Sequence, residues 1–256
     1  MVWHRCPLWN PAIGLTACRC IAVDLLHTFY LGSLAEWCKL SFWCLIQAGL
    51  WGGHLTTADE RDAIAIHALF HELLQFYSRY DRLHPGHPIT RISKLTPSKL
   101  GKGRGDHKFK ANAMETLGAA LFLMDYLPTR RDGLGALGEK LIEGGSRLVG
   151  FLEDLKELGP TISITDAQKL LDGWKHWMRV AEELRASTPK AHLMYHLIMR
   201  SVRQGNPILY QAFADESLNR TLRDALRLCH QRAFEQLGML KMAEKLKRPS
   251  VRMRLR

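Results

Sequence analysis

The chain has 256 residues, of which 46% are hydrophobic, and its 36 Lys and Arg exceed its 25 Asp and Glu to leave a net charge of +11. That composition is ordinary for a globular protein with a packed core, and the length allows one large domain or two small ones. The positive balance favours an anionic partner, with nucleic acid as the first candidate, although a protein that is merely basic would have the same composition.

The six cysteines, four of which precede residue 40, are too few for a disulfide framework in a chain of this length. They indicate a reduced, intracellular compartment. His4, Cys6, Cys18 and Cys20 could form a zinc cluster, but Cys-x-Cys is not a standard zinc-finger spacing and the second half of a finger is absent. Prolines near the start interrupt any apolar run, so no signal peptide is expected.

The first third of the chain is expected to bury a hydrophobic helix. A short apolar run near residues 16–23 predicts a strand, and a helical pattern begins at Leu25, with Gly32 as a bend. Residues 31–53 are hydrophobic enough to raise the question of a membrane span. Polar residues interrupt them, and the remaining apolar runs are shorter than about 18 residues. We therefore expect a buried core helix and no membrane partner.

The rest of the chain is expected to be mainly helical. Thr57-x-x-Glu60 resembles a capping box and opens a helix over residues 59–80. The Pro-, Gly- and Lys-rich residues 82–110 are interpreted as a solvated linker or a flexible basic arm that contacts phosphates, and their GKGRG segment lacks the order of a P-loop. Further helices are expected over residues 108–126, over residues 134–158, from a cap at Thr165 or Asp166 to residue 186, and from residue 188 to a turn at Gly205-Asn206-Pro207.

Two histidine pairs have the i, i+4 spacing that places both rings on one face of a helix. His67 and His71 lie in the helix over residues 59–80, and Glu72 follows His71, but the His-Glu-x-x-His order of a zinc protease is absent. His192 and His196 lie before the turn, near Lys190. After the turn, Glu216, Arg220 and Arg223 share one face of another expected helix, whose opposite face is apolar.

Two separated stretches resemble one family. The first contains Pro7-Leu8-Trp9, then Asp24-x-Leu26-His27, then Gly32; the second contains Pro189-Lys190-x-His192-x-x-x-His196, followed by Glu216, Leu218 and Asn219. Their order and spacing resemble those of CACTA-like DDE transposases of the Plavaka type. The resemblance implies an RNase H-like fold interrupted by a helical insertion, of which this chain would be the C-terminal part. The expected divisions are 1–34 for a remnant of the RNase H-like core, 35–186 for the insertion and 187–256 for the C-terminal helices with a basic tail.

The resemblance also implies a chemistry. Asp24 and Glu216 would be two of three catalytic carboxylates that hold Mg²⁺ for DNA strand cleavage and transfer. The residues that it implies for DNA contact are His27, Lys190, His192, His196, Asn219, Arg220 and Arg223. The first carboxylate of the family would lie upstream of Asp24, and residues 1–23 contain no Asp or Glu. We therefore expect a decayed copy or a truncated sequence that is nuclear, binds DNA and is inactive in strand cleavage.

Plainer interpretations stay open. Asp24 can simply cap the helix that follows it, and Glu216 can pair with Arg220 at i, i+4. His192 and His196 can be hydrogen-bonded histidines of the core. The alternative function is a non-catalytic helical interaction protein with a basic nucleic-acid-binding surface and a capacity to self-associate. A metal-dependent hydrolase that uses one of the histidine pairs is the third and weakest hypothesis.

Overall fold

The structure is a computed structural model that describes residues 23–51, 57–101 and 108–213. The chain separates into two units, Met1–Tyr210 and Gln211–Arg256, and every helix described below belongs to the first. The described residues form helices and connecting segments without a strand, which confirms the mainly α class. The strand expected near residues 16–23 falls outside the described ranges up to residue 22.

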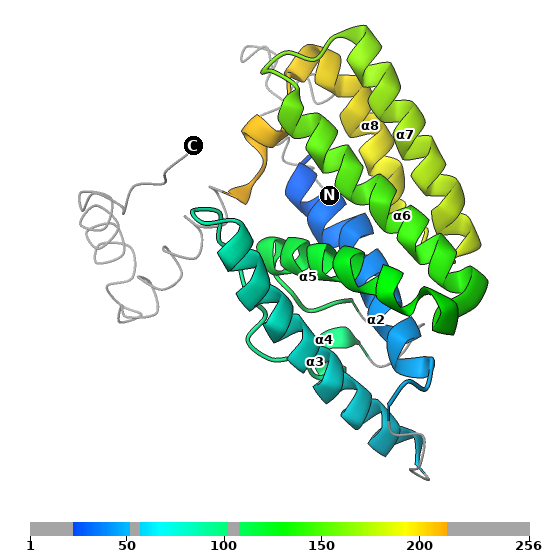
Figure 1. Ribbon diagram of the computed structural model, residues 1–256. Helices are drawn as coiled ribbons and strands as arrows, with labels where there is room; N and C mark the ends of the chain where they lie inside the picture. Colours follow the sequence, from blue (N-terminus) through cyan, green and yellow to red (C-terminus); the bar gives the residue numbers. More distant parts are fainter. Residues whose placement is uncertain (1–22, 52–56, 102–107, 214–256) are drawn as a thin grey trace, which may run out of the picture. The chain divides into compact units, whose positions relative to one another are not determined.

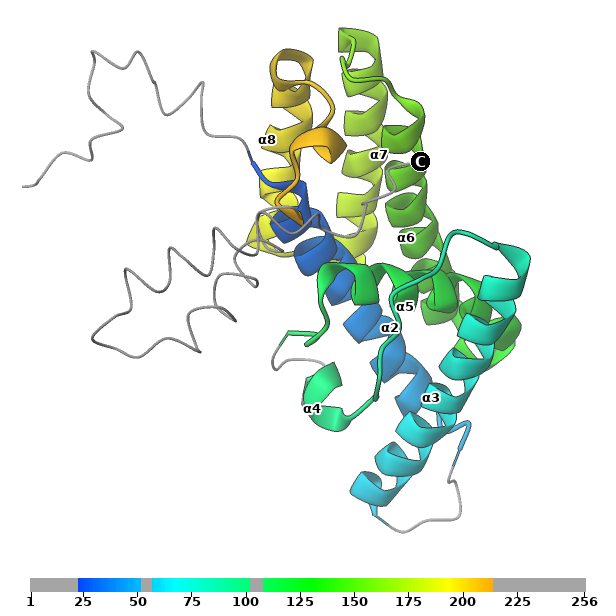
Figure 2. The same ribbon diagram turned by 90° about the vertical axis from the view of Figure 1, so that its left-hand side faces the viewer.

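The centre of the first unit is a continuous helix (Figures 1 and 2). Its first part, η3 (Leu26–Leu34), is a π-helix that continues into α2 (Ala35–Gln47). In α2, eleven of the 13 residues are buried, including Lys39, which forms an ion pair of 2.8 Å with Glu36. Helices α3, α4, α5 and α6 all contact α2. The hydrophobic segment is therefore a core helix, as predicted, and no helix among the described residues is both long and apolar enough to cross a membrane.

Helix α3 (Ala58–Leu83) begins where the sequence indicates. The Thr57 hydroxyl oxygen accepts the backbone N–H of Glu60 at 3.3 Å, so the predicted N-cap is confirmed. The Glu60 carboxylate in turn accepts the Thr57 hydroxyl at 2.6 Å. This exchange satisfies one of the amide donors that a helix start leaves without an intrahelical partner.

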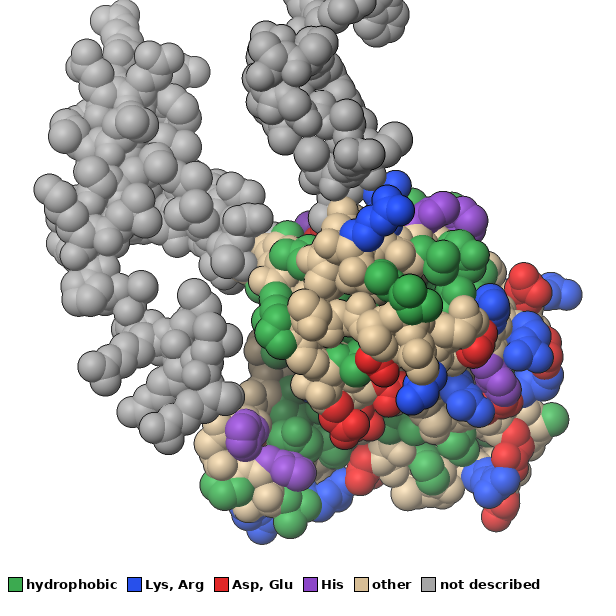
Figure 3. All heavy atoms as spheres, turned by 90° about the horizontal axis from the view of Figure 1, so that it is seen from above, with side chains coloured by type: hydrophobic (Ala, Val, Ile, Leu, Met, Phe, Trp, Pro, Cys, Tyr) green, Lys and Arg blue, Asp and Glu red, His purple; other side chains and the backbone are tan. Residues whose placement is uncertain are grey.

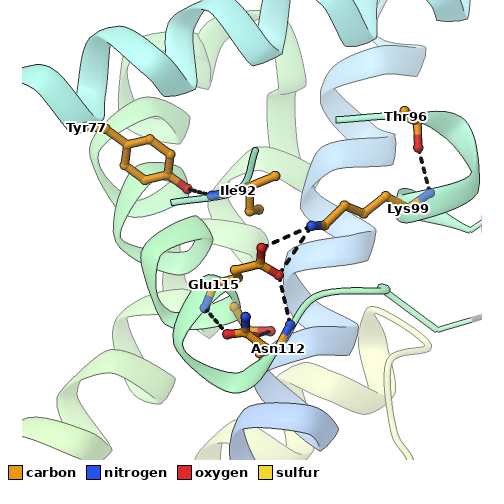
Figure 4. A network of polar contacts seen from close by, with 7 residues as sticks. Tyr77, Ile92, Thr96, Lys99, Asn112 and Glu115 are labelled. Atoms are coloured by element: carbon orange, nitrogen blue, oxygen red, sulfur yellow. Dashed lines mark hydrogen bonds and ion pairs between the residues drawn. The ribbon is translucent and has the colours of Figure 1, made fainter. Parts of the chain in front are cut away.

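The connection after α3 is packed, which corrects the expectation of a solvated linker over residues 82–110. It contains the short helix α4 (Pro97–Leu100) and four buried side chains, namely Ile92, Leu95, Leu100 and Phe109. The backbone N–H of Ile92 donates to the Tyr77 hydroxyl at 3.2 Å (Figure 4). These apolar residues are separated by polar ones, so no helical or strand periodicity reveals their burial. Most of the GKGRG segment lies outside the described residues.

Helix α5 (Ala113–Tyr126) begins five residues later than predicted because a capping box sets its start. Asn112 accepts the Glu115 N–H at 2.9 Å, and Glu115 accepts the Asn112 N–H at 3.0 Å. Lys99 of α4 also reaches the Glu115 carboxylate, at 3.2 Å (Figure 4). This ion pair ties the connecting segment to the start of α5.

The last helices of the unit pack side by side. The 3-10 turn η4 (Leu127–Arg130) leads into α6 (Arg131–Glu157), which is followed by α7 (Ile164–Glu183), α8 (Pro189–Gln204) and the 3-10 turn η5 (Pro207–Tyr210). Helix α6 packs on α7, and α7 packs on α8 (Figure 1). The cap of α7 is Ser163, whose hydroxyl oxygen accepts the Asp166 N–H at 3.0 Å, and not Thr165 or Asp166 as predicted.

Three buried tryptophans join helices through their indole N–H groups, each of which donates to a backbone carbonyl. The pairs are Trp37 with Leu141, Trp43 with Leu100 and Trp174 with Ala191, all at 3.0 Å. A buried indole N–H without a partner would cost about 1–3 kcal/mol, so these bonds specify how the helices meet as well as stabilising them.

The predicted turn at Gly205-Asn206-Pro207 is confirmed, and it also closes α6. The buried Asn206 amide donates to the carbonyls of Leu155 at 2.7 Å and Leu158 at 3.1 Å. Gly205 has a φ of 84° and a Cβ added to it would lie 2.8 Å from the Pro160 carbonyl oxygen, so a side chain is excluded there. One turn thus supplies partners for the last carbonyls of a helix some 50 residues earlier.

The divisions expected after residues 34 and 186 stay predictions. In the described chain, η3 continues directly into α2, and α8 packs on η3. The segments on either side of both expected divisions therefore share one core.

The close approach of α6 to the central helix gives the first testable prediction. A Cβ at Gly145 would overlap the Trp37 ring and the Met124 sulfur, so we expect Gly145→Ala to lower the free energy of unfolding by about 1–3 kcal/mol through overpacking. Gly150 lies on the same helix with no atom within 4 Å of an added Cβ. Gly150→Ala should therefore raise stability by up to about 1 kcal/mol. Urea unfolding of both variants checks this, and equal effects would contradict the packing of α6.

Candidate functional site

The candidate site begins at Asp24, whose carboxylate holds the start of η3. Its Oδ1 accepts the Leu26 N–H at 3.3 Å, and its Oδ2 accepts the His27 N–H at 3.0 Å. The His27 Nδ1 lies 2.5 Å from the same Oδ2. The Asp24 side chain is 25% exposed and the His27 side chain is 52% exposed. Asp24 therefore caps a helix and is oriented by His27, and both expected roles occur in one arrangement.

The next turn of η3 is opened by Gly32, whose φ of −119° and ψ of −106° are not helical. The bend predicted at Gly32 is therefore confirmed. A π-helix is wider than an α-helix, and such segments are uncommon and often occur at functional sites. Here the carbonyl oxygen of Leu31 accepts a hydrogen bond from Lys190 Nζ of α8 at 2.9 Å.

Lys190 reaches this carbonyl by lying directly over Gly32. A Cβ added to Gly32 would be 3.0 Å from Lys190 Cδ and 3.2 Å from Lys190 Cβ, so a larger residue would push the lysine away. The burial of the ammonium group lowers the pKa of Lys190, and the positive charge of Lys108 lowers it further. The amine expected to contact DNA thus makes a hydrogen bond within the chain.

A second contact joins the same two helices. The Thr28 hydroxyl, which donates to the Asp24 carbonyl at 2.6 Å, lies 3.3 Å from the Met194 sulfur of α8. The blue start of η3 lies beside the yellow α8 in both views (Figures 1 and 2). Sequence reasoning missed Thr28 and Leu31, because neither is titratable. The spacing of Thr28, four residues after Asp24, was the one available signal.

Helix α8 presents its two histidines on the side away from the core. Thr188 caps the helix by accepting the Ala191 N–H at 3.4 Å, and Pro189 occupies the first turn. Its buried face consists of Ala191, Met194, Leu197, Ile198 and Ser201. His192 is exposed and His196 is half-buried, so neither is a core histidine. Their Nε2 atoms are 3.1 Å apart, and the Tyr195 ring lies parallel to that of His192.

The other histidine pair has the same spacing but a different arrangement. His67 and His71 are both exposed on α3, and the His71 Nδ1 is 3.2 Å from the Gln75 amide nitrogen. Within the described part of the chain, no group of three or more His, Cys, Asp or Glu side chains could hold a metal ion.

The Mg²⁺ site implied by the resemblance is therefore not complete among the described residues. Asp24 is its one described acid, and both of its oxygens accept hydrogen bonds from the first turn of η3. Glu216 lies outside the described ranges, as do Asn219, Arg220 and Arg223. The described residues bring Asp24, His27 and Lys190 to one joint between two helices, and they place His192 and His196 together on α8.

Comparisons of the chain with protein-family models, with curated proteins and with solved structures find no match.

The joint between η3 and α8 gives a second prediction. Replacing Lys190 with Met keeps most of the aliphatic stem but removes the donor to the Leu31 carbonyl, so the free energy of unfolding should fall by about 1 kcal/mol or more. Lys175→Met is the matched control, because this exposed lysine of α7 lies 3.4 Å from the exposed Asp172, and its loss should change stability by less than about 0.5 kcal/mol. Equal effects in urea unfolding would contradict a structural role for Lys190.

A third prediction separates the cap from the charge at Asp24. Asp24→Ala removes both acceptors of the first turn and should cost about 0.5–2 kcal/mol of unfolding free energy. Asp24→Asn keeps an acceptor that caps equally well and should cost much less. If the two variants lose the same stability in thermal or urea unfolding, the contact with His27, and not the cap, is what Asp24 contributes.

Proposed function

We propose that this chain is the C-terminal part of the catalytic domain of a CACTA-like DDE transposase, and that it binds DNA through phosphate contacts without cleaving it. One observation supports this proposal above the others. The two stretches that resemble the family are more than 150 residues apart in sequence, yet they pack against each other through Lys190 with Leu31 and Thr28 with Met194. Active-site residues of one enzyme need such proximity, whereas chance resemblances in two stretches do not.

The metal chemistry would need more than the described residues. In a complete site of this family the carboxylates hold Mg²⁺, which stabilises charge on the attacking and leaving oxygens. Among this chain's own residues, Asp24 would offer a carboxylate that His27 orients, and Glu216 would offer a second. Residues 1–23 contain no third acid, which is why we propose DNA binding and not strand cleavage.

The charge of the chain supports a DNA contact at its C-terminal end. Residues 214–256 contain eleven Lys and Arg and five Asp and Glu, a net of +6 out of the +11 of the whole chain. On the face of the helical unit drawn in Figure 3, by contrast, acidic and basic side chains are interspersed. Phosphate binding depends on Lys and Arg that are not neutralised by nearby acids, so we assign the main contact to residues 214–256. A nuclear location belongs to the same proposal.

A second candidate function is a helical interaction protein without catalysis. The observation that favours it is the outward side of α8, where Leu193, Tyr195, Met199 and Val202 are 37–50% exposed. Apolar side chains gathered on one exposed helix face are typical of a surface that contacts another protein. Self-association would use this face.

A titration with duplex DNA at several salt concentrations tests the first proposal. Replacing Arg252, Arg254 and Arg256 with Gln should weaken binding and reduce the slope of log K against log salt by about 0.9 for each phosphate contact removed. The matched control replaces Lys169, Lys175 and Arg179, which are exposed on α7, with Gln and removes the same charge. We expect the control to keep its slope.

Two results would contradict the proposal: no binding by the full chain at low salt, or equal losses in both triple variants. Repeating the titration with Mg²⁺ probes the carboxylates. A gain in affinity that Glu216→Ala and Asp24→Asn both abolish would mean that the two acids still share a metal ion.

A further inference from the structure

The exposed side of α8 carries a pair of imidazoles in a chelating arrangement. His192 and His196 are four residues apart, so their side chains lie on the same face of the helix one turn apart. Their Nε2 atoms are 3.1 Å apart, and the planes of the rings are at 87° to each other. We propose that these two nitrogens bind one divalent transition-metal ion, of the class of Zn²⁺, Ni²⁺ or Cu²⁺.

The separation of the two nitrogens fits a single ion. Imidazole nitrogens lie about 2.0–2.1 Å from Zn²⁺, so two of them 3.1 Å apart subtend about 100° at the metal. That angle falls between the right angle of square-planar or octahedral ligands and the tetrahedral angle. Without metal, the same separation is a hydrogen bond in which one Nε2–H donates to the other nitrogen. Metal binding replaces this proton, which returns to Nδ1 of the same ring through solvent.

The backbone under the pair is held firmly. Thr188 caps the first turn, and the Ala191 carbonyl accepts the indole N–H of the buried Trp174 at 3.0 Å. Met194 and Leu197 are completely buried on the opposite side of the helix. The spacing of the two histidine Cα atoms is therefore set before a metal arrives, so binding costs only the ordering of two side chains. Because His192 is exposed, the ion can reach the site from solvent.

The chemistry of the donors selects the class of ion. Neutral imidazole suits Zn²⁺, Ni²⁺ and Cu²⁺, whereas Mg²⁺ prefers oxygen ligands. No third His, Cys, Asp or Glu joins the pair among the described residues, so the remaining positions on the ion are open to water or to an outside donor. The site is distinct from the carboxylate site of the proposed function, and it neither needs DNA nor depends on Glu216.

The pair His67 and His71 is an internal comparison. It has the same spacing on α3 and is fully exposed, but the Gln75 amide lies against the His71 ring, and within the described ranges the two rings are not in contact. A metal would have to displace the Gln75 contact and reorient the rings. The arrangement on α8 should therefore bind more tightly than equal spacing alone would predict.

Calorimetric titration of the full chain with Zn²⁺ tests the proposal. Cys6, Cys18, Cys20 and Cys229 are replaced with Ser in every sample so that these thiols do not compete. We expect His192→Ala/His196→Ala to lower the highest affinity by about a hundred-fold, because one ion is then no longer held by two linked ligands. His67→Ala/His71→Ala should leave that affinity unchanged. Far-UV circular dichroism verifies that each variant is folded.

Two further arms keep the proposal falsifiable. His196→Ala alone should lose nearly as much affinity as the double variant, and Cu²⁺ bound to the parent should give a paramagnetic resonance spectrum with two equivalent nitrogen couplings. An unchanged affinity in His192→Ala/His196→Ala would overturn the proposal, as would equal losses in the two double variants. Because no DNA is present, these results are independent of the DNA titration.

Discussion

Burial of the helix from Leu26 to Gln47 on nearly every side is the constraint from which the arrangement of the other helices follows. A helix without a polar face must receive apolar contacts or hydrogen-bond partners from each neighbour, because an unpaired polar group in the core is costly. Helix α6 meets this demand with Gly145, which admits the Trp37 ring, and with the Leu141 carbonyl, which accepts its N–H. The segment before α5 meets it with the Leu100 carbonyl, the acceptor for Trp43.

The same helix determines where Asp24 lies. Its first part is a π-helix with a bend at Gly32, and α8 packs over this bend because glycine leaves room for the stem of Lys190. The hydrogen bond from Lys190 to Leu31 therefore fixes the distance between the start of the central helix and the start of α8. Any function that combines Asp24 with residues of α8 depends on this joint.

The chain separates hard and borderline ligands as well as charge. Carboxylate oxygens are found at Asp24 and in residues beyond 213, whereas the paired imidazole nitrogens stand on the outer side of α8. Ions that prefer oxygen and ions that prefer nitrogen would thus have different sites. The excess of basic residues is concentrated in residues 214–256, so a polyanion and a transition metal need not compete for the same side chains.

Local signals in the sequence determined much of the fold. The mainly helical class, the N-cap at Thr57, the buried helix after Gly32 and the turn before Pro207 all follow from periodicity and from residues with strong backbone preferences. Starts of helices were less certain where several cap residues stand together, as at Ser163, Thr165 and Asp166.

What only the tertiary structure decided are the contacts between distant segments. The burial of Ile92 and Leu95, the reach of Asn206 to the end of α6 and the bond of Lys190 to Leu31 carry no periodic signal. In the sequence, Lys190 was an amine available to phosphate, because a lysine looks the same whether it points to solvent or to a carbonyl. The sequence by itself determined which residues could form helices and a site, whereas the packing of α8 on a bent helix decided which of them meet.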